Sequence, residues 1–230
     1  MRENKVKKKL AAGGTSLGAF MFDFATAGSA RIAEAAGAEY ILWDLEHTGW
    51  GTETIKELMS AARGVDIVAG VRVPATAYHL IAVPLDLGVE AIMIPNVKTK
   101  AHAEEIVSYA KYPPVGNRGV GILYTDQLVD GDVGKTLESI NDEQWILAQI
   151  ESVEGLENAD AIAGVEGIDV LWIGHFDLTT SMGIPGQFEH PDYLSAVEHL
   201  VDVCNKHNKT LGQMVVSPEQ GQPLLDQGFR

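Results

Sequence analysis

Three titratable side chains, Asp44, Glu46 and His47, directly follow the apolar run from Tyr40 to Trp43. Histidine has an unperturbed pKa near neutrality, so His47 could act as a general base, and the carboxylate of Asp44 could orient its ring. A single histidine at the end of a strand can equally be structural. The sequence therefore leaves two interpretations of His47 open, a catalytic base with Asp44 as its partner and a structural side chain.

Two further carboxylates, Glu151 and Asp177, come at or just after the apolar runs AQI and VLWI. Burying two carboxylates without a cation is costly, and oxygen ligands without a Cys/His cluster favour a hard divalent metal such as Mg²⁺ or Mn²⁺. Alternatively, either acid pairs with Arg72 or caps a helix. Arg72, in the stretch GVRVP, could stabilise a developing oxyanion or simply bridge acids at the strand ends.

Several other kinds of chemistry find little support. The sequence contains no G-x-S-x-G motif and no zinc-type Cys/His spacing. The lysines nearest a strand end, Lys98 and Lys100, lie in the polar stretch NVKTK, which argues against imine formation. GNRGVG resembles a phosphate-binding loop, but it lacks a preceding strand and a clear following helix. The remaining histidines are expected on the surface: His79, His102, His190, His199 and His207.

Composition describes an ordinary globular protein. The 230 residues are 46% hydrophobic and 21% charged, with a formal net charge of −15. This charge disfavours nucleic acids and anionic membrane surfaces, and no apolar run approaches the roughly 20 residues of a membrane helix. A single cysteine, Cys204, suits a reducing compartment, so we expect a cytoplasmic protein. The basic run KVKKK (residues 5–9) is interpreted as a solvated arm or a first helix.

The candidate residues lie at the ends of short apolar runs that alternate with longer amphipathic stretches, a pattern typical of repeated βα units. The apolar runs predict seven strands: residues 17–22, 40–44, 67–72, 91–95, 145–151, 170–174 and 210–215. The stretches that follow predict seven helices: residues 29–36, 52–63, 75–87, 100–109, 153–163, 191–207 and 218–227. Residues 112–144 form the longest irregular segment, which we expect to be a long functional loop.

Seven βα units predict one α/β domain over residues 1–230, with the architecture of a TIM (β/α)8-type barrel. The eighth βα unit is expected to be missing, because the chain stops at Arg230. An open doubly wound sheet is the alternative, but polar residues at the carboxyl ends of nearly all the strands favour a barrel. In a barrel these side chains would project into one mouth.

Longer motifs run through essentially all of residues 1–230: MRENKVKKKLAAG, WDLEHTG, VRVP, LDLGVEAIMIPNV, YPPVGNRGVG, the run from QIESVEGLEN to GHFDLTTSMG, and HPDY. Together they resemble the HpcH/HpaI aldolase family of metal-dependent (class II) pyruvate aldolases. The resemblance implies a (β/α)8 barrel and reversible retro-aldol cleavage of a 4-hydroxy-2-oxo acid to pyruvate and an aldehyde. It also implies a homo-oligomer, a trimer or a hexamer.

The same resemblance implies a divalent metal ion held by Glu151 and Asp177. Mg²⁺ or Mn²⁺ is expected, with Co²⁺ as a further candidate. The 2-oxo acid would bind near Gln149 and the main-chain amides of Phe176 and Asp177.

Four residues match the family's catalytic groups. His47 is implied as the base, with Asp44 as its partner, and Arg72 as the group that steadies the enolate oxygen. Asp86 of LDLG matches an acid that the family contributes across a subunit boundary to support the histidine.

Two other functions stay open. A citramalyl- or malyl-CoA-type lyase belongs to the same superfamily. A CoA substrate favours a basic nucleotide-binding surface, and the sequence of this acidic chain gives no sign of one. A non-catalytic truncated remnant that binds 2-oxo acids would follow from the loss of the last unit.

Overall fold

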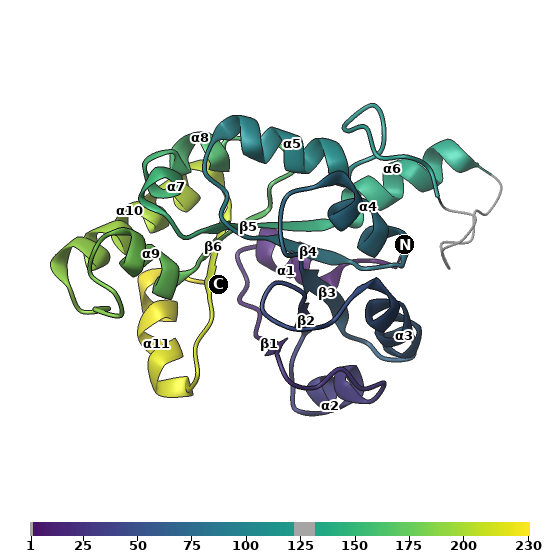
Figure 1. The fold of residues 1–230 in the computed structure, drawn as a ribbon, viewed down its shortest axis with the longest axis horizontal. Helices are drawn as coiled ribbons and strands as arrows, with labels where there is room; N and C mark the ends of the chain where they lie inside the picture. The colour runs from purple at the N-terminus through teal and green to yellow at the C-terminus, as the bar shows by residue number, and fades with distance from the viewer. Residues whose placement is uncertain (1, 122–131) are drawn as a thin grey trace.

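The computed structural model describes residues 2–121 and 132–230. Seven parallel strands form one curled sheet in the order β1 to β7. Their bounds match the predicted strands, trimmed by at most two residues at either end: β1 (Gly18–Met21), β2 (Tyr40–Asp44), β3 (Val68–Arg72), β4 (Ala91–Ile94), β5 (Trp145–Ile150), β6 (Val170–Ile173) and β7 (Thr210–Gln213). The strands lie in the middle of the molecule and helices surround them (Figure 1). The prediction of a TIM-like α/β fold is therefore confirmed.

The helices outside the sheet follow the predicted pattern, except that α6 and α9 were not predicted and the helix predicted over residues 153–163 is divided. Their bounds are α1 (Lys5–Ala11), α2 (Ser29–Ala35), α3 (Thr52–Ala62), α4 (Tyr78–Asp86), α5 (Lys100–Ala110), α6 (Val133–Glu143), α7 (Val153–Glu157), α8 (Ala159–Ala163), α9 (His175–Ser181), α10 (Pro191–His207) and α11 (Pro218–Gln227). The single helix predicted over residues 153–163 is two short helices that meet at Asn158. None of the described helices is long and apolar enough to cross a membrane.

The prediction of a long loop over residues 112–144 is wrong for its last third, which is α6. Asp132 caps this helix by accepting a hydrogen bond from the main-chain nitrogen of Lys135 at 3.1 Å. Among the apolar side chains of α6 only Ile140 is buried, and Val133 is 48% exposed. Val133, Leu137 and Ile140 do repeat at helical spacing, and the helix was missed because most of its other residues are polar. Residues 122–131 of the predicted loop lie outside the described residues.

The basic N-terminal run is a helix rather than a solvated arm. The Asn4 side chain caps α1 by accepting from the main-chain nitrogen of Lys7 at 2.9 Å. Val6 and Leu10 are buried in the cluster of side chains enclosed by the curled sheet, and α1 lies behind the strands in Figure 1. Lys5, Lys8 and Lys9 are exposed, and Lys7 donates to the Gln144 carbonyl at 2.8 Å, while the apolar face of α1 closes the amino-terminal end of the sheet.

Alternation along each strand separates two hydrophobic layers. Tyr40 and Leu42 of β2 belong to the inner cluster, whereas Ile41 and Trp43 face the outer helices. The inner layer is tight, since a Cβ on Gly70 would lie only 2.7 Å from the Cβ of Ala91. Because side chains alternate with a period of two, the next inward position of each strand is fixed by this packing. On β2, β3 and β5 these next positions carry polar residues, Asp44, Arg72 and Gln149.

The sheet is open between β1 and β7, which do not pair within the described residues. A cavity of about 330 Å³ lies along this opening. Arg230 spans its amino-terminal end, because its main-chain nitrogen donates to the oxygen of Leu211 at 3.1 Å and its oxygen accepts from Ser16 at 3.3 Å. The missing eighth unit stays a prediction.

Candidate active site

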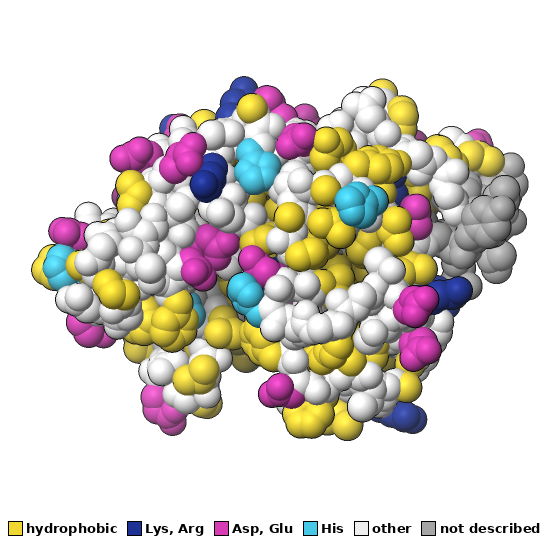
Figure 2. Space-filling model, viewed as in Figure 1, with side chains coloured by type: hydrophobic (Ala, Val, Ile, Leu, Met, Phe, Trp, Pro, Cys, Tyr) yellow, Lys and Arg dark blue, Asp and Glu magenta, His cyan; other side chains and the backbone are white. Residues whose placement is uncertain are grey.

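The polar side chains continue the inward-facing positions of neighbouring strands. Asp44 follows Leu42 by two residues on β2, and Arg72 stands opposite Asp44 in the register of β2 and β3. On β5, Gln149 follows the inward Leu147, and Glu151 comes next in the same alternation. At the centre of this face, acidic and histidine side chains gather beside hydrophobic ones (Figure 2). The structure thus places Asp44, Arg72, Gln149 and Glu151 together at the carboxyl ends of the strands.

Asp44 and Arg72 form a buried ion pair. Nε of Arg72 donates to Oδ1 of Asp44 at 2.7 Å and Nη2 donates to Oδ2 at 2.8 Å, while the two side chains are 0% and 8% exposed. Burial acts to raise the pKa of Asp44, but the guanidinium and two main-chain N–H groups outweigh it, so the pKa is lowered. Asp44 is therefore a fixed anion that orients Arg72.

His47 is held through its main chain. The Asp44 carboxylate accepts from the main-chain nitrogens of Glu46 at 3.0 Å and His47 at 3.2 Å, and the Thr48 hydroxyl donates to the Asp44 carbonyl. The imidazole itself is exposed, with Nε2 3.6 Å from Oε2 of Glu46. Asp44 thus fixes the turn that carries His47, whereas the acid beside the ring is Glu46. The predicted direct contact of Asp44 with the ring is replaced by a link through the backbone.

Glu151 lies in a cluster of carboxylates. It is 8% exposed, and the Gln149 amide donates to its Oε2. Burial is the main cause that raises the pKa of Glu151 to about 7, and the negative charges of Glu46 and Asp177 add to it. Burial likewise raises the pKa of Glu46, although Arg72 and His47 oppose the shift. The repulsion among these acids is what a bound cation would relieve.

Two buried oxygen atoms of this cluster, Oε1 of Gln149 and Oε2 of Glu46, have no hydrogen-bond partner within the described part of the chain. The Glu46 oxygen lies 3.2 Å from Nε of Arg72 without forming a hydrogen bond. Unsatisfied buried oxygens are costly and are common where an ion or water belongs. The donor set, carboxylate and amide oxygens, suits a hard divalent cation.

The site is not a closed cage of protein ligands. Among the described residues, no three His, Cys, Asp or Glu side chains converge as a ready-made metal site. Two carboxylates with open positions are nevertheless a usual way to bind Mg²⁺, which keeps several waters that a substrate can replace. The assignment of Glu151 and Asp177 as these two acids stays a prediction.

A cavity of about 260 Å³ opens beside the carboxylates. Gly174 is essential to its shape, because a Cβ there would lie 2.6 Å from the Glu151 Cβ and 2.8 Å from the Gln149 amide nitrogen. Directly after Gly174, the first turn of α9 places the exposed side chains of Phe176 and Asp177 at the cavity. The residues that line the cavity are Phe20, Phe22, His47, Arg72, Gln149, Trp172, Ile173, Gly174, His175, Phe176, Asp177 and Met214.

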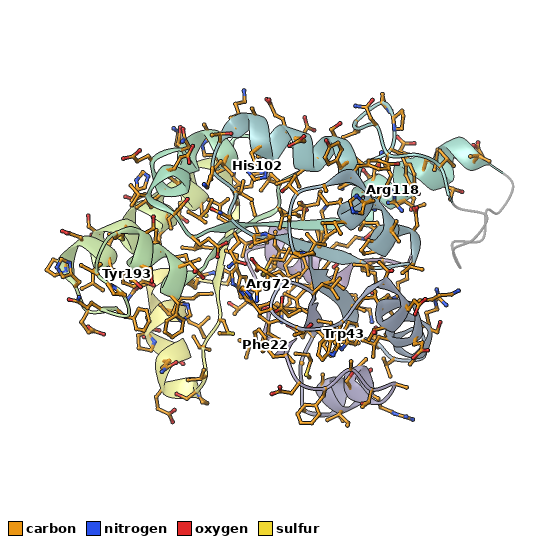
Figure 3. All side chains as sticks on the ribbon, viewed as in Figure 1. Phe22, Trp43, Arg72, His102, Arg118 and Tyr193 are labelled. Carbon is orange, nitrogen blue, oxygen red and sulfur yellow. The ribbon has the colours of Figure 1, made fainter. Side chains whose placement is uncertain are left out.

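Asp86 does not join this site within one chain. It ends α4, and its Oδ1 accepts from Nη2 of Arg118 at 2.5 Å and from Nε at 3.1 Å. The Arg118 guanidinium packs over the ring of Tyr112 at 4.4 Å. Arg118 and Arg72 lie in different parts of the molecule (Figure 3). The role of Asp86 across a subunit boundary therefore stays a prediction.

One of the histidines expected on the surface is half-buried. His102, in the first turn of α5, has Nε2 2.7 Å from the Thr76 hydroxyl and accepts from the main-chain nitrogen of Lys98 at Nδ1, 3.4 Å away. Burial lowers its pKa. The amphipathic pattern of α5 hid this position, because the partners of His102 come from the loops after β3 and β4 rather than from its own helix.

The sequence analysis gave no role to Glu46, Gly174, Phe20 or Phe22. Glu46 lies in the same DLEH run as His47, so its proximity could have been noticed. Phe20 and Phe22 alternate at the end of β1, and the Arg72 guanidinium lies 4.8 Å from the Phe20 ring centre and 6.0 Å from that of Phe22. No sequence pattern predicts this contact between β1 and β3.

Comparison with known proteins decides the family. The family model described as HpcH/HpaI aldolase/citrate lyase matches residues 20–230. The chain belongs to the HpcH/HpaI aldolase family. The resemblance seen in its motifs is thus confirmed, and the protein is an enzyme of this aldolase family.

Individual members of the family are similar over nearly the whole chain. A hydroxypyruvate/pyruvate aldolase of Roseobacter denitrificans is 33% identical over 227 residues, which are 99% of this chain and 88% of the relative. A 2-keto-3-deoxy-L-rhamnonate aldolase of Escherichia coli K12 is 32% identical, over 98% of this chain and 84% of the relative. The crystal structure of an HpcH/HpaI aldolase from Desulfitobacterium hafniense has a TM-score of 0.92 and 31% identity, covering 97% of this chain and 87% of that one.

Proposed function

We propose that the protein catalyses reversible, metal-dependent retro-aldol cleavage of a 4-hydroxy-2-oxo acid to pyruvate and an aldehyde. The observation that carries this proposal is the cluster of Glu151, Glu46 and Asp177: burial, with the negative charges of Glu46 and Asp177 added to it, raises the pKa of Glu151 to about 7. Asp177 of this cluster lines the same cavity as Arg72 and His47. Acidic ligands on one side and a guanidinium and an imidazole on the other suit a reaction that forms an enolate.

Cleavage requires that the C4 hydroxyl lose its proton and that the C3–C4 bond break. The electron pair of that bond enters the enolate of pyruvate, the aldehyde leaves, and C3 then takes up a proton. His47, at the mouth of the cavity, is the base that accepts the hydroxyl proton, directly or through a water. Arg72, held by Asp44, presents its charge to the enolate oxygen.

Glu151 and Asp177 would hold the metal ion, with Mg²⁺ or Mn²⁺ preferred over Co²⁺ for this all-oxygen donor set. When bound, the ion supplies Lewis-acid stabilisation of the enolate oxygen. Gln149 lies beside Glu151 and offers its amide to the oxygens of the 2-oxo acid. The first main-chain N–H groups of α9, at Phe176 and Asp177, have no acceptor within the helix and are available to the substrate carboxylate.

The direct test measures pyruvate release from a 4-hydroxy-2-oxo acid with Mn²⁺ or Mg²⁺, after chelation, and after the metal is restored. Exchange of the pyruvate C3 protons with D₂O reports enolate formation without any aldehyde. Activity and exchange should both need the metal and should both fall in Glu151→Gln. Turnover that survives chelation and Glu151→Ala would refute the mechanism.

A CoA-dependent lyase is the less favoured alternative. Of the side chains that line the cavity, Arg72 is the one with a permanent positive charge, and Asp44 already binds it. A CoA substrate would need further cations for its phosphates. A non-catalytic remnant is disfavoured because His47, Arg72, Gln149 and Asp177 all line one cavity. A homo-oligomer, trimer or hexamer, and a cytoplasmic location remain part of the proposal.

A further inference from the structure

Much of the wall of this cavity is aromatic. It is formed from the end of β1, the end of β6 and the start of α9, which are far apart in sequence. The chemistry proposed above takes place at C2 to C4 of the substrate, so everything beyond C4 must lie against the remaining wall. The apolar and aromatic members of this wall are Phe20, Phe22, Trp172, His175, Phe176 and Met214.

Phe22 is fixed in place at one side of the mouth. Its ring centre lies 4.7 Å from that of Phe20, and both rings lie over the guanidinium of Arg72. Figure 3 shows Phe22 next to Arg72. The ring of Phe22 nevertheless stays 38% exposed. A ring held from behind by a cation–π contact and open in front offers a preformed apolar surface.

Phe176, another aromatic residue of the cavity lining, is also held in place by its neighbours and open to solvent. Its ring packs against His175 at 4.6 Å and Phe188 at 5.1 Å, and Phe188 is in turn 5.9 Å from Tyr193. Phe176 remains 58% exposed. An exposed aromatic ring that its neighbours hold in one orientation costs little conformational entropy when a ligand covers it.

The charge around the cavity disfavours an anionic substituent. Asp177 lines the cavity, and its carboxylate repels a second anion. Arg72, the one permanently cationic side chain of the described lining, is paired with Asp44. An aldehyde with a distal carboxylate would therefore meet repulsion and no free cation.

From this arrangement we propose that the aldehyde portion of the substrate is uncharged and carries an apolar group of aromatic size, seated between Phe22 and Phe176. The proposal rests on the aldolase function above and adds its substrate class. Apolar pockets of this kind discriminate by roughly 10-fold or more. Polyhydroxylated or dianionic substrates would lose this contact and gain no polar partner in exchange.

A matched pair of aldehydes tests the proposal. 3-Phenylpropanal and 4-oxobutanoate share the same CH₂CH₂CHO unit and differ in a phenyl or a carboxylate group. With pyruvate and Mn²⁺ fixed, kcat/KM for aldol addition should be about 10-fold higher for 3-phenylpropanal. Added salt should raise the use of 4-oxobutanoate, because it screens the repulsion.

Three variants locate the preference. Phe22→Ala should bring the ratio of the two kcat/KM values close to one, and Phe22→Lys should reverse it by supplying a cation. Phe24→Ala is the matched control, because Phe24 is 67% exposed two residues further on and does not line the cavity. Because a general loss of activity lowers both kcat/KM values by the same factor, it leaves their ratio unchanged. Saturation-transfer NMR with 3-phenylpropanol on the metal-free protein should show binding that Phe22→Ala weakens and Phe24→Ala keeps.

The outcomes separate the two proposals. If pyruvate protons exchange but 4-oxobutanoate is used as well as or better than 3-phenylpropanal, the aromatic subsite is refuted and the aldolase function stands. A preference that Phe22→Ala and Phe22→Lys leave unchanged also refutes it. If the wild-type protein with metal shows neither exchange nor addition, the proposed function itself fails.

Discussion

Asp44 and Arg72 stand opposite each other on adjacent parallel strands, and two hydrogen bonds of 2.7 and 2.8 Å join their buried side chains. The same carboxylate accepts from the main-chain nitrogen of His47. One side chain thus sets the position of both the cation and the imidazole that the reaction needs. This makes Asp44 a positioning residue, one step removed from the substrate.

Asp44→Asn should lower kcat more than it raises KM for pyruvate, because Arg72 and the turn at His47 lose their common anchor. Breaking a buried ion pair from one side typically costs about 3–5 kcal/mol of stability, so urea denaturation should show a large loss. Arg72→Lys should lose activity as well, since lysine cannot make the paired contact. Asp66→Asn is the control: its ion pair with Lys5 is exposed and should matter little. Full activity in Asp44→Asn would contradict this assignment.

The stability of the metal-free protein should depend on Glu151. Its pKa is 4.5 when exposed and about 7 in the folded protein, so the folded state binds the proton more tightly between these values. By linkage, this group's contribution to the free energy of unfolding falls as pH rises from 4.5 to about 7, by up to about 3 kcal/mol. Glu151→Gln should reduce that slope and leave a smaller one of the same sign, because burial also raises the pKa of Glu46.

Denaturant titrations at pH 5, 6, 7 and 8 measure the effect, with EDTA present throughout. Asp44 has a lowered pKa and stays ionised over this range, so it adds no slope of its own. Mn²⁺ should stabilise the wild-type protein more at pH 8 than at pH 5, because the ion competes with the proton for Glu151. The same pH slope in Glu151→Gln would show that another group is responsible.

Gly174→Ala should damage the site while leaving the fold intact. A methyl group at this position would meet the Glu151 Cβ at 2.6 Å and the Gln149 amide nitrogen at 2.8 Å, closer than side chains pack. Glu151 would have to move, so Mn²⁺ affinity and activity should fall at least about 10-fold. Gly49→Ala is a suitable control, since a Cβ there meets nothing within 4 Å. Calorimetric titration with Mn²⁺ and circular dichroism distinguish a lost site from a lost fold, and unchanged affinity would contradict the packing argument.

The strands and the site at their carboxyl ends were predictable because both depend on short-range patterns. Apolar runs such as WILAQI end in polar residues, and a period of two places Gln149 and Glu151 on the inner face. The partnership of Asp44 was not predictable. A spacing of three residues from His47 suggested a direct contact with the ring, whereas Arg72, a neighbour only through strand register, takes the carboxylate.

Other features depend on tertiary contacts that leave no local trace. Helix α6 buries only one of its apolar side chains, and its mainly polar composition made it resemble the loop that precedes it. The placement of Phe22 beside Arg72 requires β1 to lie near β3 across the curled sheet. The role of Gly174 follows from the crowding of Glu151, which only the folded structure shows.

Asp86 offers a test of assembly. In one chain its carboxylate is held by Arg118, away from the cavity, yet the family resemblance predicts that it supports His47 of a neighbouring subunit. If so, inactive His47→Asn and Asp86→Asn variants that are unfolded and refolded together should regain activity, because some sites then combine an intact His47 with an intact Asp86. A mixture of His47→Asn and Glu151→Gln should stay inactive, since both residues serve the same site from the same chain. Light scattering would report the oligomer. Full activity of Asp86→Asn alone, or no recovery in the mixture despite reassembly, would assign Asp86 to folding through Arg118 instead.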